Sequence, residues 1–322
     1  MRDYVIRRIL LLIPQLFVLS LITFGITRLV PGEPGIVAQV SDTMAMADPR
    51  FEETIRMHLG LDRPLHVQYW EWLVRVVQFD FGHSYVNLSM PVSDLVRQRL
   101  GPTLLLTGTA LVIATIGGTL AGALAARWRN TWIDHSLTSF TFFFLSVPNF
   151  WAGIIALTIF AIWLGWLPSS GMSPPGESPT IGSVARHLIL PSTVLGLSLM
   201  ATIARYVRSS VIEVMNEDYI RTARAKGLRE YTVFGRHALR NALLPVVTIT
   251  GLRLPILIGG SVLIERVYSW PGLGRASVDA ALSRDYPVTM AMVMLVGTLT
   301  IVGNLVADLA YGFLDPRIRD ET

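Results

Sequence analysis

The strongest constraint in this sequence is a set of six long stretches that contain no Asp, Glu, Lys or Arg, apart from one arginine in the fifth. Each has about 18 residues or more, and an α-helix needs about 20 apolar residues to cross the hydrocarbon of a bilayer. The stretches are residues 9–27, 100–126, 136–168, 187–204, 241–264 and 286–307. The sequence therefore predicts an all-α membrane protein with six transmembrane helices.

The composition also favours a membrane protein over a soluble one. Hydrophobic residues make up 52% of the 322 residues and charged residues only 16%, whereas soluble domains carry about 25% charged residues. There is no cysteine, which excludes disulfides, thiolate metal sites and thiol nucleophiles. The first apolar stretch is expected to be a retained helix, because it is longer than the core of a signal peptide and no Ala-x-Ala site follows it.

Arginine and lysine gather on one predicted side of the membrane. They lie in residues 1–8, in the loop after the second helix, in the long loop 209–240 and in the C-terminal tail. Cytoplasmic loops carry an excess of Arg and Lys, so both termini are expected in the cytoplasm (N-in, C-in). This placement accounts for the net charge of +4. It favours membrane topology over nucleic-acid binding, since the charges sit in several separate short loops beside the spans.

These boundaries predict three regions. Residues 1–30 would form the N-terminus and first transmembrane helix, residues 31–99 a helical extracytoplasmic segment, and residues 100–322 a five-helix core. The helices of this core are expected at 100–126, 135–167, 187–208, 241–265 and 286–312, with the cytoplasmic loop at 209–240 between the fourth and fifth transmembrane helices.

The extracytoplasmic segment shows helical periodicity at 51–59, 65–78 and 92–100,. It would serve either as a cap packed on the bundle or as a docking or gating surface, and the sequence favours neither. Pro, Gly and Ser dominate residues 168–182, which predicts an irregular outer loop,. Gly118 and Gly122 have the GxxxG spacing that permits close approach of two helices.

The motifs that carry catalysis are absent from the sequence. It has no GxxxxGK[ST] phosphate loop, no HExxH pair and no GxSxG elbow,. Its six histidines are scattered rather than clustered as metal ligands would be,. We therefore expect no catalytic residue, no metal site and no cofactor in this chain.

The cytoplasmic loop contains one well-delimited helical pattern. Asn216 is expected to cap the helix, acidic residues fill its first turn, basic residues fill its last turn, and Gly227 supplies a left-handed C-cap,. Ile220, Ala223 and Gly227 share one face of small residues. A helix lying on anionic headgroups is one interpretation. A face so small favours the alternative, in which the helix docks in a groove on a protein partner.

This loop resembles the cytoplasmic coupling loop of the permeases of binding-protein-dependent ABC importers. More narrowly, the chain is similar to the first of the two permeases in the dipeptide/oligopeptide/nickel family (the dipeptide or oligopeptide permease B type). The matching stretches are EDYIRTARAKGL (217–228), RHALRNALLPVVT (236–248), Arg7-Arg8, PGEP (31–34), LGLDRP (59–64), DFG (80–82), YSWPGLG (268–274), RDYP (284–287) and DPRIR (315–319).

The resemblance implies an assembly. A second homologous permease would complete the pathway, two cytoplasmic ATPase subunits would bind ATP and Mg²⁺, and an extracytoplasmic binding protein would deliver substrate at the bacterial inner membrane. The chain itself would not be an enzyme. The residues to which the resemblance assigns ATPase coupling are Glu217, Asp218, Tyr219, Arg221, Thr222, Ala223, Arg224, Ala225, Lys226 and Gly227.

The sequence departs from the family pattern at two places. The general importer loop begins Glu-Ala-Ala, whereas Arg221, Thr222 and Ala223 stand here, a form usual in the peptide subfamily. At Arg253 the family pattern has an uncharged residue, often Gln. Arg253 lies near the middle of the fifth predicted helix, where a charge costs at least about 2.5–3.5 kcal/mol,. It would either line the translocation pathway and attract a peptide carboxylate or form a structural pair.

The cargo stays open among several classes. Di- and oligopeptides are the first expectation, and glutathione, nickel or metal chelates and sugars are alternatives within the same architecture. A stand-alone secondary transporter that uses Arg253 as its substrate site is a further alternative.

Overall fold

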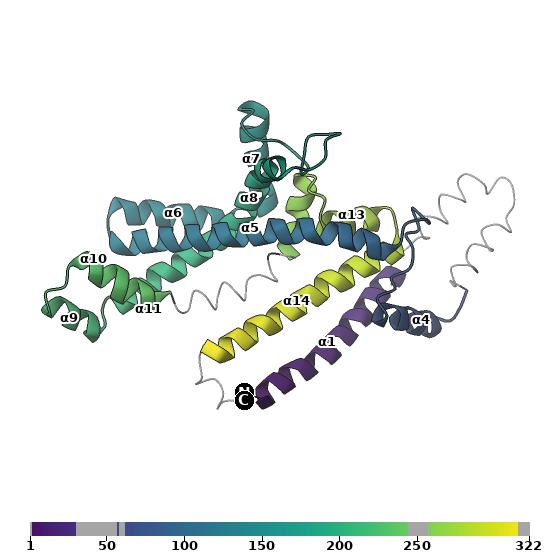
Figure 1. Cartoon of the computed structure of the whole chain (residues 1–322), viewed down its shortest axis with the longest axis horizontal. Helices are drawn as coiled ribbons and strands as arrows, with labels where there is room; N and C mark the ends of the chain where they lie inside the picture. The colour runs from purple at the N-terminus through teal and green to yellow at the C-terminus, as the bar shows by residue number, and fades with distance from the viewer. Residues whose placement is uncertain (1, 30–56, 58–61, 244–256, 258, 315–322) are drawn as a thin grey trace. The chain divides into compact units, whose positions relative to one another are not determined.

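The computed structural model describes residues 2–29, 57, 62–243, 257 and 259–314. These residues form helices, connecting turns and one isolated β-bridge between His83 and Pro91 (Figure 1). The helices are α1 (Arg2–Leu29), α4 (Leu65–Val77), α5 (Val92–Arg127), α6 (Trp132–Ser146), α7 (Asn149–Ala156), η1 (Leu157–Trp163), α8 (Ile181–Val214), α9 (Asp218–Ala225), α10 (Glu230–Thr232), η2 (Val233–Leu239), α11 (Arg240–Ala242), α13 (Leu273–Leu282) and α14 (Tyr286–Leu314). The prediction of an all-helical chain is confirmed for these residues.

Four described helices are long and apolar enough to cross a membrane. They are Val5–Arg28, Val92–Arg127, Ile181–Val214 and Tyr286–Val306. Each covers or nearly covers a predicted transmembrane helix, and α5 and α8 extend beyond the predicted ends. Most of the fifth predicted helix, 241–265, lies outside the described residues, and so does Arg253.

The third predicted helix, 135–167, is not a single straight helix. It divides into two parts, of which the first is α6 and the second is formed by α7 and η1 together. The axes of these two parts are bent by 107° to each other. The break is at Val147, whose backbone is extended (φ −88°, ψ 127°). A residue before proline avoids the helical region because the ring of the proline collides with it, and Pro148 therefore ends α6. The pair counts as one more candidate span only if the two parts cross together.

The chain divides into two compact units. The first comprises Met1–Val5, Leu104–Trp270 and Val302–Thr322, and the second comprises Ile6–Thr103 and Pro271–Ile301.

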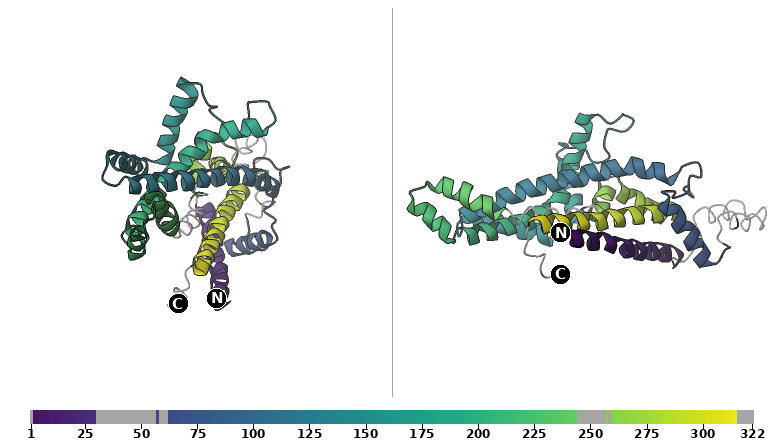
Figure 2. Two further views of the ribbon diagram at one scale, coloured as in Figure 1. Left: turned by 60° about the vertical axis from the view of Figure 1, so that its left-hand side comes forward. Right: turned by 60° about the horizontal axis from the view of Figure 1, so that its bottom comes forward.

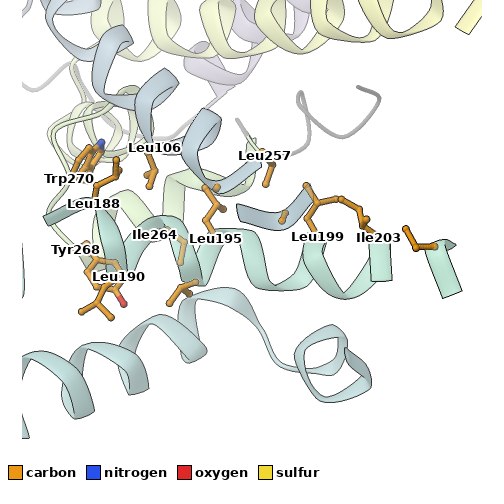
Figure 3. Close-up of a cluster of buried hydrophobic side chains, with 14 of the residues drawn as sticks. Leu106, Leu188, Leu190, Leu195, Leu199, Ile203, Leu257, Ile264, Tyr268 and Trp270 are labelled. Carbon is orange, nitrogen blue, oxygen red and sulfur yellow. The ribbon is translucent and has the colours of Figure 1, made fainter. Parts of the chain in front are cut away.

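The core of the first unit is built around α8, which contributes buried residues along most of its length. Leu195, Leu199 and Ile203 line up on this helix (Figure 3). A capping box between Thr180 and Ser183 starts the helix directly after the irregular loop. Helix α6 packs along α8.

Two glycines let α5 approach α8 closely. A Cβ atom on Gly118 would lie 2.7 Å from the carbonyl oxygen of Met200, and one on Gly122 would lie 2.4 Å from that of Ala204. On the opposing helix, a Cβ on Gly196 would lie 2.8 Å from the carbonyl oxygen of Ala110. The backbones themselves are in contact here, so the GxxxG spacing marks a true helix contact.

We expect Gly122→Ala to destabilise the first unit, because the added methyl group meets backbone atoms that cannot turn away. Overpacking of this kind costs about 1–3 kcal/mol. Gly108→Ala is the matched control on the same helix, since nothing lies within 4 Å of its Cβ position. The apparent melting temperature of the purified protein should fall for Gly122→Ala and stay level or rise for Gly108→Ala. Equal melting temperatures for the two variants would contradict the close contact.

The segment that follows the fifth predicted helix holds the loop after η1 against the core. The Tyr268 hydroxyl donates to the carbonyl of Gly153 (2.9 Å), and the carbonyl of Tyr268 accepts from the amide of Gly171 (2.9 Å). Tyr268 and Trp270 are both buried in the core (Figure 3). Part of the YSWPGLG motif therefore holds α7 and the loop after η1 in place.

The second unit contains the described part of the segment 31–99. Helix α4 confirms the helix expected at 65–78, and it packs on α1 through Tyr69, whose hydroxyl bonds Ser20 (2.8 Å) and whose ring meets Phe24 edge-on. The helix expected at 51–59 falls almost wholly outside the described residues. The helix expected at 92–100 is the first part of α5 rather than a separate element.

Asp285 binds the turn at residues 84–86, which lies between α4 and α5. This buried carboxylate accepts hydrogen bonds from the Ser84 hydroxyl, from the amide of Tyr85 (3.0 Å) and from the amide of Val86 (3.4 Å). It directly precedes α14, where the helix dipole favours a negative charge,. The RDYP motif thus positions part of the segment 31–99 against the start of α14.

Candidate coupling hairpin

A helical hairpin, residues 215–243, follows the end of α8 (Figures 1 and 2). Helix α8 runs to Val214, past the predicted membrane boundary at residue 208. After a short turn the chain forms α9, reverses at Gly227, and returns through α10, η2 and α11. All the residues assigned to ATPase coupling by resemblance lie in the first half of this hairpin.

The reversal at Gly227 has the geometry of a Schellman motif. Gly227 has φ +76°, its amide donates to the carbonyl of Arg224 (2.9 Å), and the amide of Leu228 donates to the carbonyl of Ala223 (3.4 Å). Glycine reaches this left-handed conformation without a steric penalty. The predicted left-handed C-cap is confirmed.

The prediction for the start of α9 was wrong. Glu217, not Asn216, is the N-cap residue, and no side chain caps the helix there. The Asn216 amide instead donates to the carbonyl of Ile212, one turn back on α8 (3.0 Å). The last turn of α8 leaves carbonyls without helical partners, and Asn216 satisfies one of them.

The small-residue face of α9 packs inside the hairpin rather than facing outward. Ile220 is fully buried and Ala223 is 6% exposed, and together with Val233 and Ala238 they form a separate hydrophobic cluster. The returning segment supplies the covering residues. The expectation that this face fits a groove on a partner protein is therefore corrected, since the face already has its partner within the chain.

The opposite face of α9 is the one that is available to a partner. Its exposed members are Asp218, Tyr219, Arg221, Thr222, Arg224, Ala225 and Lys226. Arg221 pairs with Asp218 (3.3 Å), and Arg224 pairs with Glu230 of α10 (2.8 Å). Exposed ion pairs of this kind contribute less than about 1 kcal/mol, so these charges can exchange partners on binding.

Two hydrogen bonds hold the returning helical segment of the hairpin in place. The Ser210 hydroxyl on α8 donates to the carbonyl of Ala242 (3.1 Å), and the Asn241 amide donates to the hydroxyl of Tyr219 (3.3 Å). Helix α9 is therefore linked to α8 through side-chain contacts with α11 as well as through the chain itself.

A buried ion pair joins α6 to the same end of α8. The Asp134 carboxylate is 2% exposed and accepts two hydrogen bonds from the Arg208 guanidinium, at 2.6 and 2.8 Å. Bidentate charge-assisted pairs of this geometry are strong. In the sequence these two residues read only as charges flanking membrane spans, and nothing in their 74-residue separation indicates that they meet.

The first unit also contains a cavity of about 260 Å³ lined by the end of α6, the start of α7, the middle of α8, Leu257 and Gly260. Asn149, Ser198 and Thr202 give it a polar side, and Leu145, Leu195, Leu199 and Leu257 give it an apolar side. Sequence reasoning assigned no role to these residues. Isolated Asn, Ser and Thr residues in apolar helices carry no distinctive pattern.

No metal site emerges in the part of the chain that the structure describes, where no three His, Asp or Glu residues come together. His187, at the boundary of a predicted helix, bonds the carbonyl of Ser183 through Nδ1 (2.7 Å). It is a polar side chain within the first turns of α8.

Comparison with known proteins identifies relatives along the whole chain. The family model described as "Binding-protein-dependent transport system inner membrane component" matches residues 118–320, and its N-terminal companion model matches residues 1–107. The oligopeptide transport system permease protein AppB of Bacillus subtilis is 43% identical over 322 residues, which cover 99% of each chain. The glutathione transport system permease protein GsiC of Escherichia coli K12 is 42% identical over 320 residues, also 99% of each.

Proposed function

Since this chain belongs to the family of binding-protein-dependent transport system inner membrane components, we propose that it forms half of the translocation pathway of an ATP-driven importer for short peptides. The chain is a multi-pass inner-membrane permease subunit and not an enzyme. The proposal rests on sequence similarity to two permeases, which extends over the full length of the chain. One is named for oligopeptides and the other for glutathione, itself a tripeptide.

The proposed topology has six transmembrane helices with both termini in the cytoplasm. The lengths of α1, α5, α8 and α14, together with the bent pair α6–η1, support it. The basic residues of the hairpin and of the α5–α6 turn support its orientation. The proposed domains stay as predicted: 1–30, the extracytoplasmic segment 31–99 and the core 100–322.

The hairpin is the proposed contact with a cytoplasmic ATPase subunit. The residues that would face the ATPase are Glu217, Asp218, Tyr219, Arg221, Thr222, Arg224, Ala225 and Lys226, while Ala223 and Gly227 would shape the hairpin. ATP and Mg²⁺ would be bound by the ATPases. Closure of two ATPases would move α9 and, through it, tilt α8. This rigid-body movement would alternate the access of the pathway between the two sides of the membrane.

The polar cavity is the proposed stretch of substrate path in this subunit. Asn149, Ser198 and Thr202 offer both donors and acceptors, which suits the backbone of a peptide of any sequence,. A second homologous permease would supply the facing half, and an extracytoplasmic binding protein would deliver cargo. Arg253 stays a proposed pathway residue outside the described part of the chain.

Reconstitution of the complete complex with its own binding protein tests this function. Dipeptides, longer peptides, glutathione, a nickel chelate and a disaccharide are added in turn, and both ATP hydrolysis and uptake of the added compound are measured, with and without the ATPase subunits. We expect short peptides or glutathione to stimulate hydrolysis several-fold. Stimulation by the chelate or the sugar alone would overturn the peptide class, and transport without any ATPase subunit would overturn the importer.

A further inference from the structure

Each end of α8 has an arginine and nearby exposed tryptophans, which are the residues expected where a helix meets a membrane interface. Arg186 and Arg205 are about 19 residues apart, or roughly 28 Å along a helix,, close to the thickness of a bilayer's hydrocarbon. The Arg186 guanidinium donates to the carbonyl of Trp166 (3.1 Å), and Trp166 and Trp163 are exposed. Exposed tryptophans gather at headgroup depth.

The Arg205 end has an equivalent aromatic pair. Trp128 is 44% exposed and Trp132 is 77% exposed, and they flank the turn between α5 and α6. Asp134, two residues beyond Trp132, is bound to Arg208 of α8. The α5–α6 turn therefore lies against the Arg205 end of α8, at the second interface.

A cavity of about 310 Å³ opens between α5, α6 and α8 at this level. Its apolar wall is formed by Ala121, Ala125, Leu137, Phe142 and Ala204. Its polar rim is formed by Asn130, His135, Thr138, Arg205 and the Asp134–Arg208 pair. Phe142, two turns along α6 from His135, is 53% exposed, so the apolar wall continues toward the hydrocarbon.

The charge of this rim is positive because its one acid is already neutralised. Besides the two bonds from Arg208, the Asp134 carboxylate accepts from the amide of Asn130 (3.0 Å) and from the hydroxyl of Thr138 (3.3 Å). Four donors fill the acceptor sites of a carboxylate. Arg205 is exposed, and among the described residues no carboxylate pairs with it.

An apolar wall, a cationic rim and a place at an interface together match one kind of ligand. Basic pockets between transmembrane helices on the cytoplasmic side hold anionic headgroups, and the apolar wall fits an acyl chain. We propose that the α5–α6–α8 cavity binds one anionic phospholipid of the cytoplasmic leaflet, with its phosphate at Arg205. The leaflet rests on the proposed topology, whereas the lipid class rests on the cavity alone.

Lipid binding to the intact, delipidated complex tests this site. Dioleoyl phosphatidylglycerol and dioleoyl phosphatidylcholine, which have identical chains, are titrated and adducts are counted by native mass spectrometry. Arg205→Gln should weaken phosphatidylglycerol binding about fivefold, as expected for one basic residue at an anionic headgroup. Arg186→Gln, which removes an equal charge from the other end of α8, should leave binding unchanged.

A second variant tests the apolar wall. Ala121→Phe would fill the cavity and leave every charge in place, so it should also reduce phosphatidylglycerol binding. The proposal is overturned if phosphatidylcholine binds equally, if inorganic phosphate displaces the lipid, or if Arg205→Gln binds like the unaltered protein. It is also overturned if the cavity is closed by the second permease, so that the complex shows no adduct sensitive to Arg205.

The leaflet is tested separately. Because the chain has no cysteine, single cysteines at Arg129 and Ser169 report the two sides through a membrane-impermeant maleimide. Labelling of Ser169→Cys in intact cells and of Arg129→Cys only in broken cells supports the cytoplasmic leaflet. The reverse pattern overturns the topology and the leaflet, while the phosphatidylglycerol titration still decides the lipid class.

Discussion

Replacing Asp134 by alanine should destabilise the protein more than any exposed charge substitution. The change leaves the Arg208 guanidinium, 30% exposed, without its bidentate partner, and it also removes the acceptor for the Asn130 amide. Breaking a buried pair on one side costs about 3–5 kcal/mol. We expect about 3 kcal/mol, the lower figure, because water still reaches Arg208. Thermal unfolding in detergent should show a large fall in the apparent melting temperature and a low yield of folded protein.

Two comparisons separate burial from charge in this prediction. Glu71→Ala removes the acid of an exposed ion pair, in which the Glu71 side chain is 44% exposed and the Arg63 side chain is 52% exposed. It should change the melting temperature little. The double variant Asp134→Ala/Arg208→Met removes both charges and should recover part of the lost stability, because no uncompensated cation is left. A double variant less stable than Asp134→Ala would show that the cost comes from something other than the orphaned guanidinium.

The long helices were predictable because one large energy term decides them. A backbone in hydrocarbon must satisfy its own hydrogen bonds, so a charge-free stretch of sufficient length becomes a helix almost regardless of its neighbours. Helices α1, α5, α8 and α14 follow this rule. The left-handed turn at Gly227 was predictable for a similar reason, since one residue type meets a strong local steric demand,.

Prolines show where such reasoning stops. Pro14, Pro102 and Pro191 lie inside continuous helices, whereas Pro148 ends α6 and accompanies a bend of 107°. The residue type is the same at all four positions. Neighbouring helices can re-satisfy the backbone at an internal proline, so the outcome depends on packing, which a single sequence does not display.

The candidate site shows the same division. Helix α9 and its C-cap at Gly227 were predictable from the sequence pattern, but its N-cap was not. The burial of Ile220 and Ala223 was not predictable either, because it depends on the returning segment with Val233 and Ala238. Small residues on a helix face indicate close packing without indicating the partner. The Asp134–Arg208 pair could not be predicted either, since opposite charges beside two spans have many possible partners.

Replacing Gly227 by valine should uncouple transport from ATP hydrolysis. A β-branched residue at φ +76° is a backbone outlier,, and such strain costs about 1–3 kcal/mol. The hairpin can relieve it by abandoning the Schellman bonds to Arg224 and Ala223, which turns α9 away from α10. In the reconstituted complex we expect cargo-stimulated ATP hydrolysis to fall at least tenfold.

Gly235→Val is the matched control within the same hairpin. Gly235 is exposed, a Cβ there would meet nothing within 4 Å, and its φ lies outside the left-handed region. This variant should keep most of its stimulated activity. Because the strain is relieved within the hairpin, whose hydrophobic cluster is separate from the main core cluster of the first unit, the melting temperature of Gly227→Val should stay close to that of the unaltered protein while its ATPase subunits copurify poorly. If cargo stimulated ATP hydrolysis fully in Gly227→Val, the hairpin would not be the coupling element. Coupling that survives the loss of the turn at Gly227 cannot depend on the orientation of α9.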